Sequence, residues 1–140
     1  MRRAFLVIAL LTATPALADD RIPPVTDEAA KKECGACHMA YQPQFLPAES
    51  WRRLFDGLSN HFGTDASLSD PVRQQILDYY VAHAGRDLKG EPPLRISQLE
   101  WWAREHRGVK ESRWNSQSVK FKGNCVACHK TAEQGYYEDD

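Results

Sequence analysis

The sequence predicts a mainly helical fold with long irregular segments, arranged as two small lobes. Apolar residues recur at helical spacing in several stretches, and no stretch alternates convincingly between apolar and polar residues as a strand would. Residues 85–93 combine glycine, proline and charge, which is typical of a linker. We therefore expect an N-terminal lobe at 19–88 and a C-terminal lobe at 89–140 that ends in an acidic tail.

The first 18 residues are expected to be a cleaved export signal. Arg2 and Arg3 precede an uncharged apolar stretch, and Ala16-Leu17-Ala18 has the small-x-small form of a cleavage site. The stretch is too short to span a bilayer, and no cysteine follows it as in a lipoprotein. We expect a periplasmic mature protein that begins near Asp19 and has no transmembrane segment, with an uncleaved signal anchor as the alternative.

Size and charge exclude some classes of function. About 120 residues would remain, enough for one modest domain or two very small ones. The formal net charge of −1 would fall to −3 without Arg2 and Arg3. No run of basic residues favours nucleic acid.

Two helices are predicted in the first part of the chain. Thr26 is expected to cap a short helix from Asp27 to about Lys32. Helical spacing then places Trp51 and Leu58 on one apolar face, before a turn at 60–63.

Two further helices are predicted on either side of the linker. One should open at Asp70, with proline at the next position, and close at Gly85. The other should open with a capping box of Ser97 and Glu100 and close near Gly108. The acidic tail is expected to be frayed, with an acidic docking strip for a basic redox partner as the alternative.

All four cysteines lie in two copies of one motif. Each copy has the form C-x-x-C-H, with Cys34, Cys37 and His38 in one and Cys125, Cys128 and His129 in the other. This is the attachment signature of c-type haem: each cysteine sulfur bonds a vinyl group, and the histidine becomes the proximal ligand of the iron. We therefore predict two covalently bound c-type haems, with His38 and His129 as proximal ligands.

Three other interpretations explain less of the pattern. Two disulfides would leave the histidine after each cysteine pair unexplained. Zinc-binding pairs usually lie about 12–20 residues apart, whereas about ninety residues intervene here. A thioredoxin-like redox motif needs a βαβ context that this sequence lacks.

The distal position of each iron decides what the haem can do. Met39 is the only methionine beyond the predicted signal, and it adjoins His38, so methionine ligation is disfavoured. We prefer His61 and His106 as distal ligands, because one follows an apolar helix and the other ends a helix rich in tryptophan. His83 stays open as an alternative ligand. We expect His38 to pair with His61 and His129 with His106.

Several segments together resemble the bacterial dihaem cytochrome c family, often called DHC. They are C-G-A-C-H-M-A-Y, L-P-A-x-S-W, S-x-H-F-G-x-x-A-S-L, P-L-R-I-S, W-x-R-E-H-R and C-x-A-C-H, and they cover most of the chain from Cys34 to Lys130. The resemblance implies a first lobe similar to a small class I cytochrome c and a less regular second lobe. It also implies two bis-histidine haems, with His61 and His106 as distal ligands.

The predicted function is one-electron transfer without enzymatic activity, by a protein expected to be monomeric. By the resemblance, its partners would be a high-spin, oxygen-binding monohaem cytochrome c (SHP) and a membrane cytochrome b. Three alternatives stay open: a haem enzyme or gas-binding protein with one open iron site, the small dihaem subunit of a periplasmic reductase, and a zinc-binding module without haem.

Overall fold

The computed structural model describes residues 21–138, and these residues form short helices joined by long irregular segments. The α-helices are α1 (Glu28–Cys34), α2 (Ala48–Asp56), α3 (Asp70–Ala82), α4 (Glu100–Glu105) and α5 (Glu111–Trp114). Short 3₁₀ helices lie at η1 (Pro43–Phe45), η2 (Leu58–Asn60), η3 (Ile96–Gln98), η4 (Cys125–Ala127) and η5 (Ala132–Gln134).

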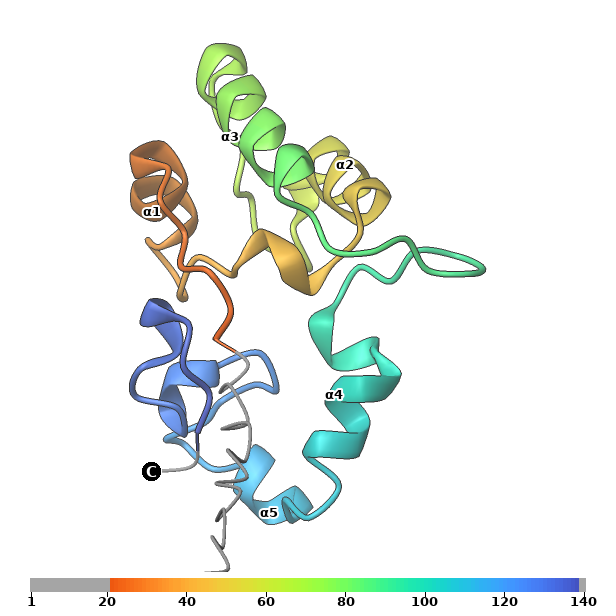
Figure 1. The fold of residues 1–140 in the computed structure, drawn as a ribbon. Coiled ribbons are helices and arrows are strands. Elements are labelled where there is room, and N and C mark those ends of the chain that lie inside the picture. Colours follow the sequence, from red (N-terminus) through yellow and green to blue (C-terminus); the bar gives the residue numbers. More distant parts are fainter. Residues whose placement is uncertain (1–20, 139–140) are drawn as a thin grey trace, which may run out of the picture.

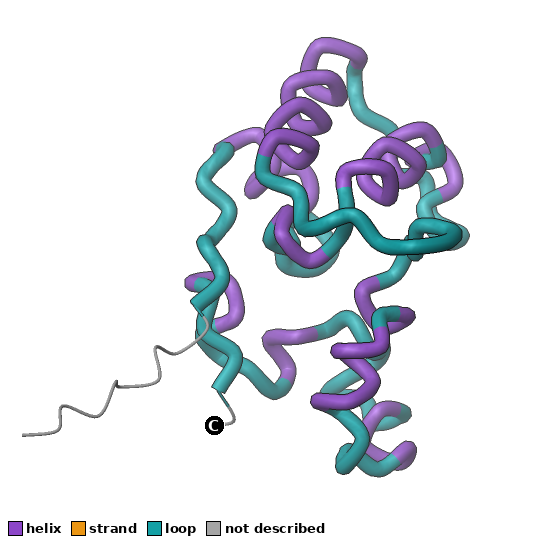
Figure 2. Tube along the Cα trace, turned by 45° about the vertical axis from the view of Figure 1, so that its right-hand side comes forward, coloured by secondary structure: helices purple, strands orange, loops and turns teal. Residues whose placement is uncertain are grey.

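The predicted mainly helical class is confirmed. Within residues 21–138 no strand forms, and pairing is limited to isolated bridges such as Pro47 with Gly85 (Figure 2). The same residues contain no helix that is long and apolar enough to cross a membrane. The predicted signal at 1–18 lies outside the described residues.

Helices α1, α2 and α3 lie together in the upper part of the molecule, and α4, α5 and the C-terminal segment lie below them (Figure 1). The core between α2 and α3 is aromatic: the ring of Tyr80 lies 4.5 Å from that of Trp51 and 6.0 Å from that of Phe55. The Trp51 indole N–H donates to the carbonyl of Pro43 at 2.8 Å. This bond satisfies the one polar group of a large buried side chain, so the ring can be buried at little cost.

The first helix begins one residue later than predicted. Asp27, rather than Thr26, is the N-cap, and its carboxylate accepts the backbone N–H of Ala30 at 2.7 Å. This bond is the first cause of the lowered pKa of Asp27, because it favours the charged carboxylate. Thr26 instead donates its backbone N–H to the hydroxyl of Tyr79 on α3.

The second predicted helix is shorter than its apolar pattern. It ends at Asp56 with Gly57 as C-cap, and Leu58 belongs to the separate turn η2. The third helix begins at Asp70 as expected but ends at Ala82. Gly85 does not close it, because the backbone N–H of Gly85 donates to the carbonyl of Leu46 at 2.9 Å.

The capping box predicted at Ser97 and Glu100 does not form. Helix α4 begins at Glu100, with Leu99 as an N-cap that makes no side-chain bond. The preceding turn η3 is held instead by Gln98, whose side-chain oxygen accepts the backbone N–H groups of Leu94 and Arg95 at 3.2 and 3.0 Å. The cap therefore lies one turn earlier than the sequence motif suggested.

The two halves of the chain are joined by several buried contacts. The side chain of Gln42 is fully buried; it donates to the carbonyl of Ala132 at 2.7 Å and accepts the hydroxyl of Tyr137 at 2.5 Å. Phe45 lies 5.8 Å from Trp101 and 5.4 Å from Tyr137, ring to ring.

The tail is not frayed over the residues described. Gly135 is buried, and its carbonyl accepts the backbone N–H of Ile22 at 3.0 Å. Tyr137 reaches the core through Gln42. The expectation of a frayed acidic terminus is therefore wrong for residues 133–138, because Gly135 bonds the backbone of Ile22 and Tyr137 packs against Phe45, contacts that composition does not reveal. Asp139 and Asp140 lie outside the described residues.

Candidate functional site

The first motif follows directly from helix α1. Cys34 is the last residue of that helix, and Gly35 is its C-cap. A side chain at Gly35 would meet the carbonyl oxygen of Lys31, so a residue without Cβ is needed at this close turn. The turn carries the chain to His38, whose ring stacks on that of Tyr41 at 4.7 Å and 20°.

His61 stands at a sharp reversal of the chain. Its backbone N–H and carbonyl both bond to Thr64, at 2.7 and 3.1 Å. Phe62 and Gly63 form the two central positions of this turn, with φ of 53° and 97°. A bulky residue such as phenylalanine rarely adopts the left-handed region. The tight turn thus fixes His61 on a rigid loop.

The structure brings the rings of His38 and His61 together. Their centroids are 6.3 Å apart, with 29° between their planes. With a metal–imidazole bond of about 2.1 Å and a ring centroid about 1.1 Å beyond the bonded nitrogen, two imidazoles on opposite sides of one iron have centroids about 6.4 Å apart. The separation in this structure therefore fits one iron between the two rings.

The second motif forms a short helical turn. At the end of η4, the backbone N–H groups of Cys128 and His129 both donate to the carbonyl of Cys125, at 3.1 and 2.8 Å. Residues three apart in such a turn lie on one face, which places Cys125 and Cys128 side by side. This arrangement suits attachment of both sulfurs to one haem edge.

The ring of His106 is held by two tryptophans at the end of α4. Trp102 is buried, and its ring stacks on His106 at 4.2 Å and 17°. The ring of Trp114, at the end of α5, lies 5.7 Å from that of His106. The rings of His106 and His129 are 6.2 Å apart at 85°, so the second pair also fits one iron.

Three of the four histidines have their second nitrogen tied to a backbone carbonyl. The Nδ1 atoms of His38, His106 and His129 bond the carbonyls of Met39, Trp102 and Glu138, at 2.7, 2.8 and 3.2 Å. A carbonyl can only accept, so Nδ1 carries the proton and Nε2 keeps a free lone pair. This arrangement, which orients the ring, is usual for metal-binding histidine.

Burial shapes the titration of the groups at both sites. Burial, then His38, then Arg95 lower the pKa of His61, which favours the neutral imidazole that can bind a metal. Burial raises the pKa of both the Cys34 and the Cys125 thiols to about 11. Redox-active cysteines need a depressed pKa, so these values argue against a thioredoxin-like centre.

His83 is placed apart from the two pairs. It caps the end of α3, where its side chain is exposed and its Nδ1 bonds the carbonyl of Tyr79 at 2.8 Å. Within residues 21–138, its one ring neighbour is Tyr79, at 4.7 Å. The structure thus brings His61 and His106, but not His83, to the motif histidines.

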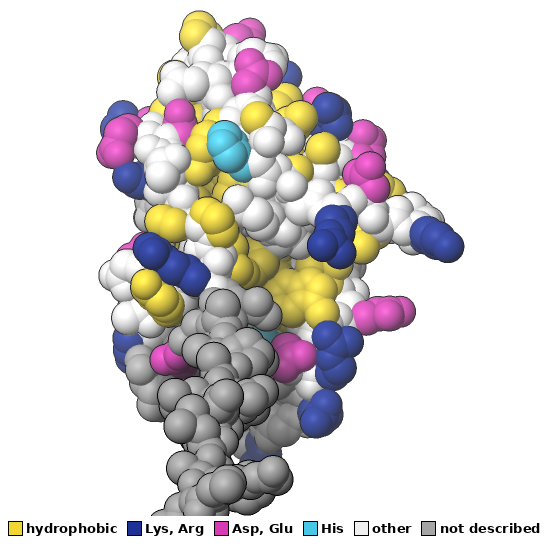
Figure 3. Space-filling model, viewed as in Figure 1, with side chains coloured by type: hydrophobic (Ala, Val, Ile, Leu, Met, Phe, Trp, Pro, Cys, Tyr) yellow, Lys and Arg dark blue, Asp and Glu magenta, His cyan; other side chains and the backbone are white. Residues whose placement is uncertain are grey.

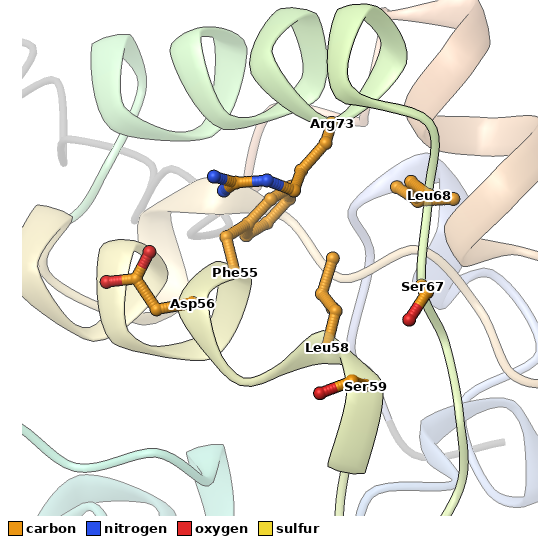
Figure 4. Close-up of a pocket in the computed structure, with 7 residues that line it drawn as sticks. All are labelled: Phe55, Asp56, Leu58, Ser59, Ser67, Leu68 and Arg73. Carbon is orange, nitrogen blue, oxygen red and sulfur yellow. The ribbon is translucent and has the colours of Figure 1, made fainter.

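A pocket between α2 and α3 is separate from both sites. It is lined by residues of α2, η2 and the following loop, together with Arg73 of α3 (Figure 4). No cysteine or histidine lines it. The Arg73 side chain extends from α3 toward the pocket, and one of its guanidinium nitrogens is buried without a hydrogen-bond partner.

Sequence reasoning missed four residues that surround the rings. Tyr41 and Phe121 lie beside His38, Tyr137 lies beside His129, and Arg95 lies over Phe62, the neighbour of His61. Phe62 and Phe121 are unusually exposed for phenylalanine, at 45% and 43%. Hydrophobic side chains also gather between the upper helices and the lower part of the molecule (Figure 3). Such surface beside the histidines suits the edge of a large apolar cofactor.

Comparison with known proteins gives consistent results. A family model described as dihaem cytochrome c matches residues 30–137. A solved structure described as the diheme cytochrome c from Rhodobacter sphaeroides is 44% identical, with a TM-score of 0.74, and covers 82% of this chain and 99% of its own. A second structure from that organism is 46% identical, with a TM-score of 0.73, covering 81% of this chain and 99% of its own.

A more distant structural match comes from another organism. A diheme cytochrome type c from Shewanella baltica OS155 is 34% identical, with a TM-score of 0.71, and covers 79% of this chain and 86% of its own. No curated protein matches the chain.

Proposed function

Since this chain belongs to the dihaem cytochrome c family, we propose that it carries single electrons between redox proteins through two bis-histidine haems. The family implies two c-type haems with iron and a role in electron transfer. The ligands, the partners and the compartment go beyond the family and form the proposal.

One observation carries the proposed ligation. Two pairs of imidazole rings lie 6.3 and 6.2 Å apart, and each pair joins a C-x-x-C-H histidine to one of the histidines predicted as distal. We assign Cys34, Cys37, His38 and His61 to the first haem site. We assign Cys125, Cys128, His129 and His106 to the second haem site.

Bound haem supplies a redox iron that gains or loses one electron. The protein supplies two imidazoles to each iron and fixes their orientation through backbone carbonyls and stacked aromatic rings. Six filled positions leave no site for a substrate or gas, because metal catalysis needs an open position. Transfer of electrons without bond chemistry follows, so we propose that the protein is not an enzyme.

Histidine rather than methionine in the distal position lowers the potential. Met39 is buried beside His38, and its carbonyl accepts the His38 Nδ1 proton. Both haems are therefore proposed to be low-potential centres.

The remaining proposals concern location and partners. We propose a monomer with lobes at 19–88 and 89–140, exported to the periplasm after cleavage of residues 1–18. The sequence features of residues 1–18 support export. By the family resemblance, the proposed partners are a high-spin monohaem cytochrome c and a membrane cytochrome b.

Carbon monoxide binding tests the ligation, because carbon monoxide binds ferrous haem only at an open position. The reduced holoprotein, exported in a host that attaches haem, should bind none. Replacing one distal ligand, in His61→Ala or His106→Ala, should create one carbon monoxide-binding haem per chain.

His83→Ala is the matched control, because His83 is exposed and its ring contacts neither histidine pair. It should behave like the unchanged protein. Stoichiometric binding by the unchanged protein would contradict the proposal and favour a gas-binding protein or enzyme. Binding in His83→Ala would show that His83 is a ligand.

A further inference from the structure

We propose that Arg95 pairs with a carboxylate of the first haem and thereby holds that haem at a higher reduction potential. The proposal rests on the assignment of His38 and His61 as ligands of one iron. It assigns a role to a side chain outside the haem motifs.

The backbone at Arg95 is fixed. Arg95 is the N-cap of η3, and both its own N–H and that of Leu94 donate to the side-chain oxygen of Gln98. The next residue, Ile96, is buried in the core. The side chain of Arg95 therefore extends from a rigid base.

The guanidinium extends to the first haem site although it belongs to the second half of the chain. Its central carbon lies 3.6 Å from the centroid of the Phe62 ring, and that ring lies 4.8 Å from the ring of His61. The stacking of a cation on an aromatic face is itself attractive. The rigid turn at Phe62 thus holds a positive charge beside the distal ligand.

The contact of Arg95 with Phe62, and the contact of Phe62 with His61, place the guanidinium among the side chains that surround the first haem site.

Arg95 has no carboxylate partner among residues 21–138. Arg53, by contrast, pairs with Glu91 at 3.0 Å. At the second haem site, Lys122 lies over the ring of Trp114 and pairs with Glu111 at 3.9 Å. An unpaired guanidinium beside a cofactor that carries two propionate groups has a matching acceptor, because its planar fork fits a carboxylate.

A positive charge near an iron favours the state with the extra electron. Arg95 also offsets the negative charge of the carboxylate that it binds, which acts in the same direction. Removing the charge should therefore lower the potential of the first haem and leave the second haem nearly unchanged, because the aromatic contacts of Arg95 lead to His61.

The test is a redox titration of the holoprotein followed by low-temperature EPR, which separates the two haems. Ligand planes at 29° split the iron orbitals strongly, whereas planes at 85° leave them nearly degenerate, so the two ferric signals differ. Arg95→Gln should lower the potential of the haem with near-parallel ligands by a tenfold change in equilibrium, about 59 mV for one electron.

Two further variants separate charge from structure. Arg95→Lys keeps the charge and should recover most of the potential, although its ammonium lacks the fork. Lys122→Gln, the control at the second haem site, should leave the first haem unchanged. Unchanged potentials in Arg95→Gln, or an equal shift of both haems, would overturn the proposal.

Failure of the ligand assignment would look different. It would appear as a high-spin ferric signal or carbon monoxide binding in the protein before any substitution. If Arg95→Gln did not yield two haems per chain, the Arg95→Lys potential would decide. If the redox equilibrium of the first haem shifted tenfold in Arg95→Lys as well, the geometry of the guanidinium, and not its charge, would set the potential.

Discussion

Replacing Gln42 with alanine should destabilise the protein more than the same substitution at an exposed glutamine. Gln42 is fully buried, and its amide bonds two partners in the C-terminal half, the carbonyl of Ala132 and the hydroxyl of Tyr137. Gln42→Ala removes both bonds and leaves the Tyr137 hydroxyl without its acceptor, which costs about 1–3 kcal/mol. The carbonyl of Ala132 keeps the backbone N–H of Gly135, so that lost bond costs only about 1 kcal/mol. We expect a loss of about 3 kcal/mol in the free energy of unfolding.

The assay is guanidinium unfolding of the holoprotein, followed by far-ultraviolet circular dichroism. Gln117→Ala is the matched control, since Gln117 is exposed and should change stability by less than about 0.5 kcal/mol. Tyr137→Phe removes only the hydroxyl but leaves the buried side-chain oxygen of Gln42 without this donor, and it should cost about 1–3 kcal/mol. In the double variant the losses should be less than additive, because both substitutions remove the same bond.

The effect should also reach the second haem. The ring of Tyr137 lies 5.6 Å from that of His129. The Nδ1 atom of His129 also bonds the carbonyl of Glu138, the residue that follows Tyr137. Gln42→Ala should therefore broaden or shift the EPR signal of the second haem more than the EPR signal of the first haem. Equal stability of Gln42→Ala and Gln117→Ala would show that the buried bonds of Gln42 do not stabilise the fold.

Two further predictions concern pH and a glycine. Burial raises the pKa of Tyr80, so the unfolded chain loses this proton first; stability should be complete below about pH 10 and fall as pH rises above it. Tyr80→Phe should flatten that decline in alkaline unfolding curves. Gly135→Ala should cost at least about 1–2 kcal/mol, because Gly135 has a φ of 89° and a Cβ there would meet the carbonyl of Ile22. Gly108→Ala, with open space around it, should be nearly neutral in the same thermal melts.

Short sequence patterns predicted the haem-binding motifs and the main helices, because neighbouring residues determine both. The C-x-x-C-H motifs predicted the cofactors, and helical spacing located α2 and α3 within a few residues. The preference for His61 and His106 came from their places near helix ends, and the structure brings both to the motif histidines.

Contacts between distant segments could not be predicted in this way. Gln42 bonds residues 90 and 95 positions away, and the hydroxyl of Tyr41 donates to the carbonyl of Gly123, 82 positions away. Neither periodicity nor composition records such pairings. For the same reason the sequence predicts a frayed acidic tail, although Tyr137 packs against the core.

EPR spin quantitation on the oxidised holoprotein shows directly whether both irons have two histidine ligands. We expect two low-spin ferric centres per chain and no high-spin centre. One signal should have the form expected of ligand planes near 29°, and the other the form expected near 85°. A stoichiometric high-spin signal would contradict bis-histidine ligation at one haem, and it would point to an iron that binds a substrate or gas.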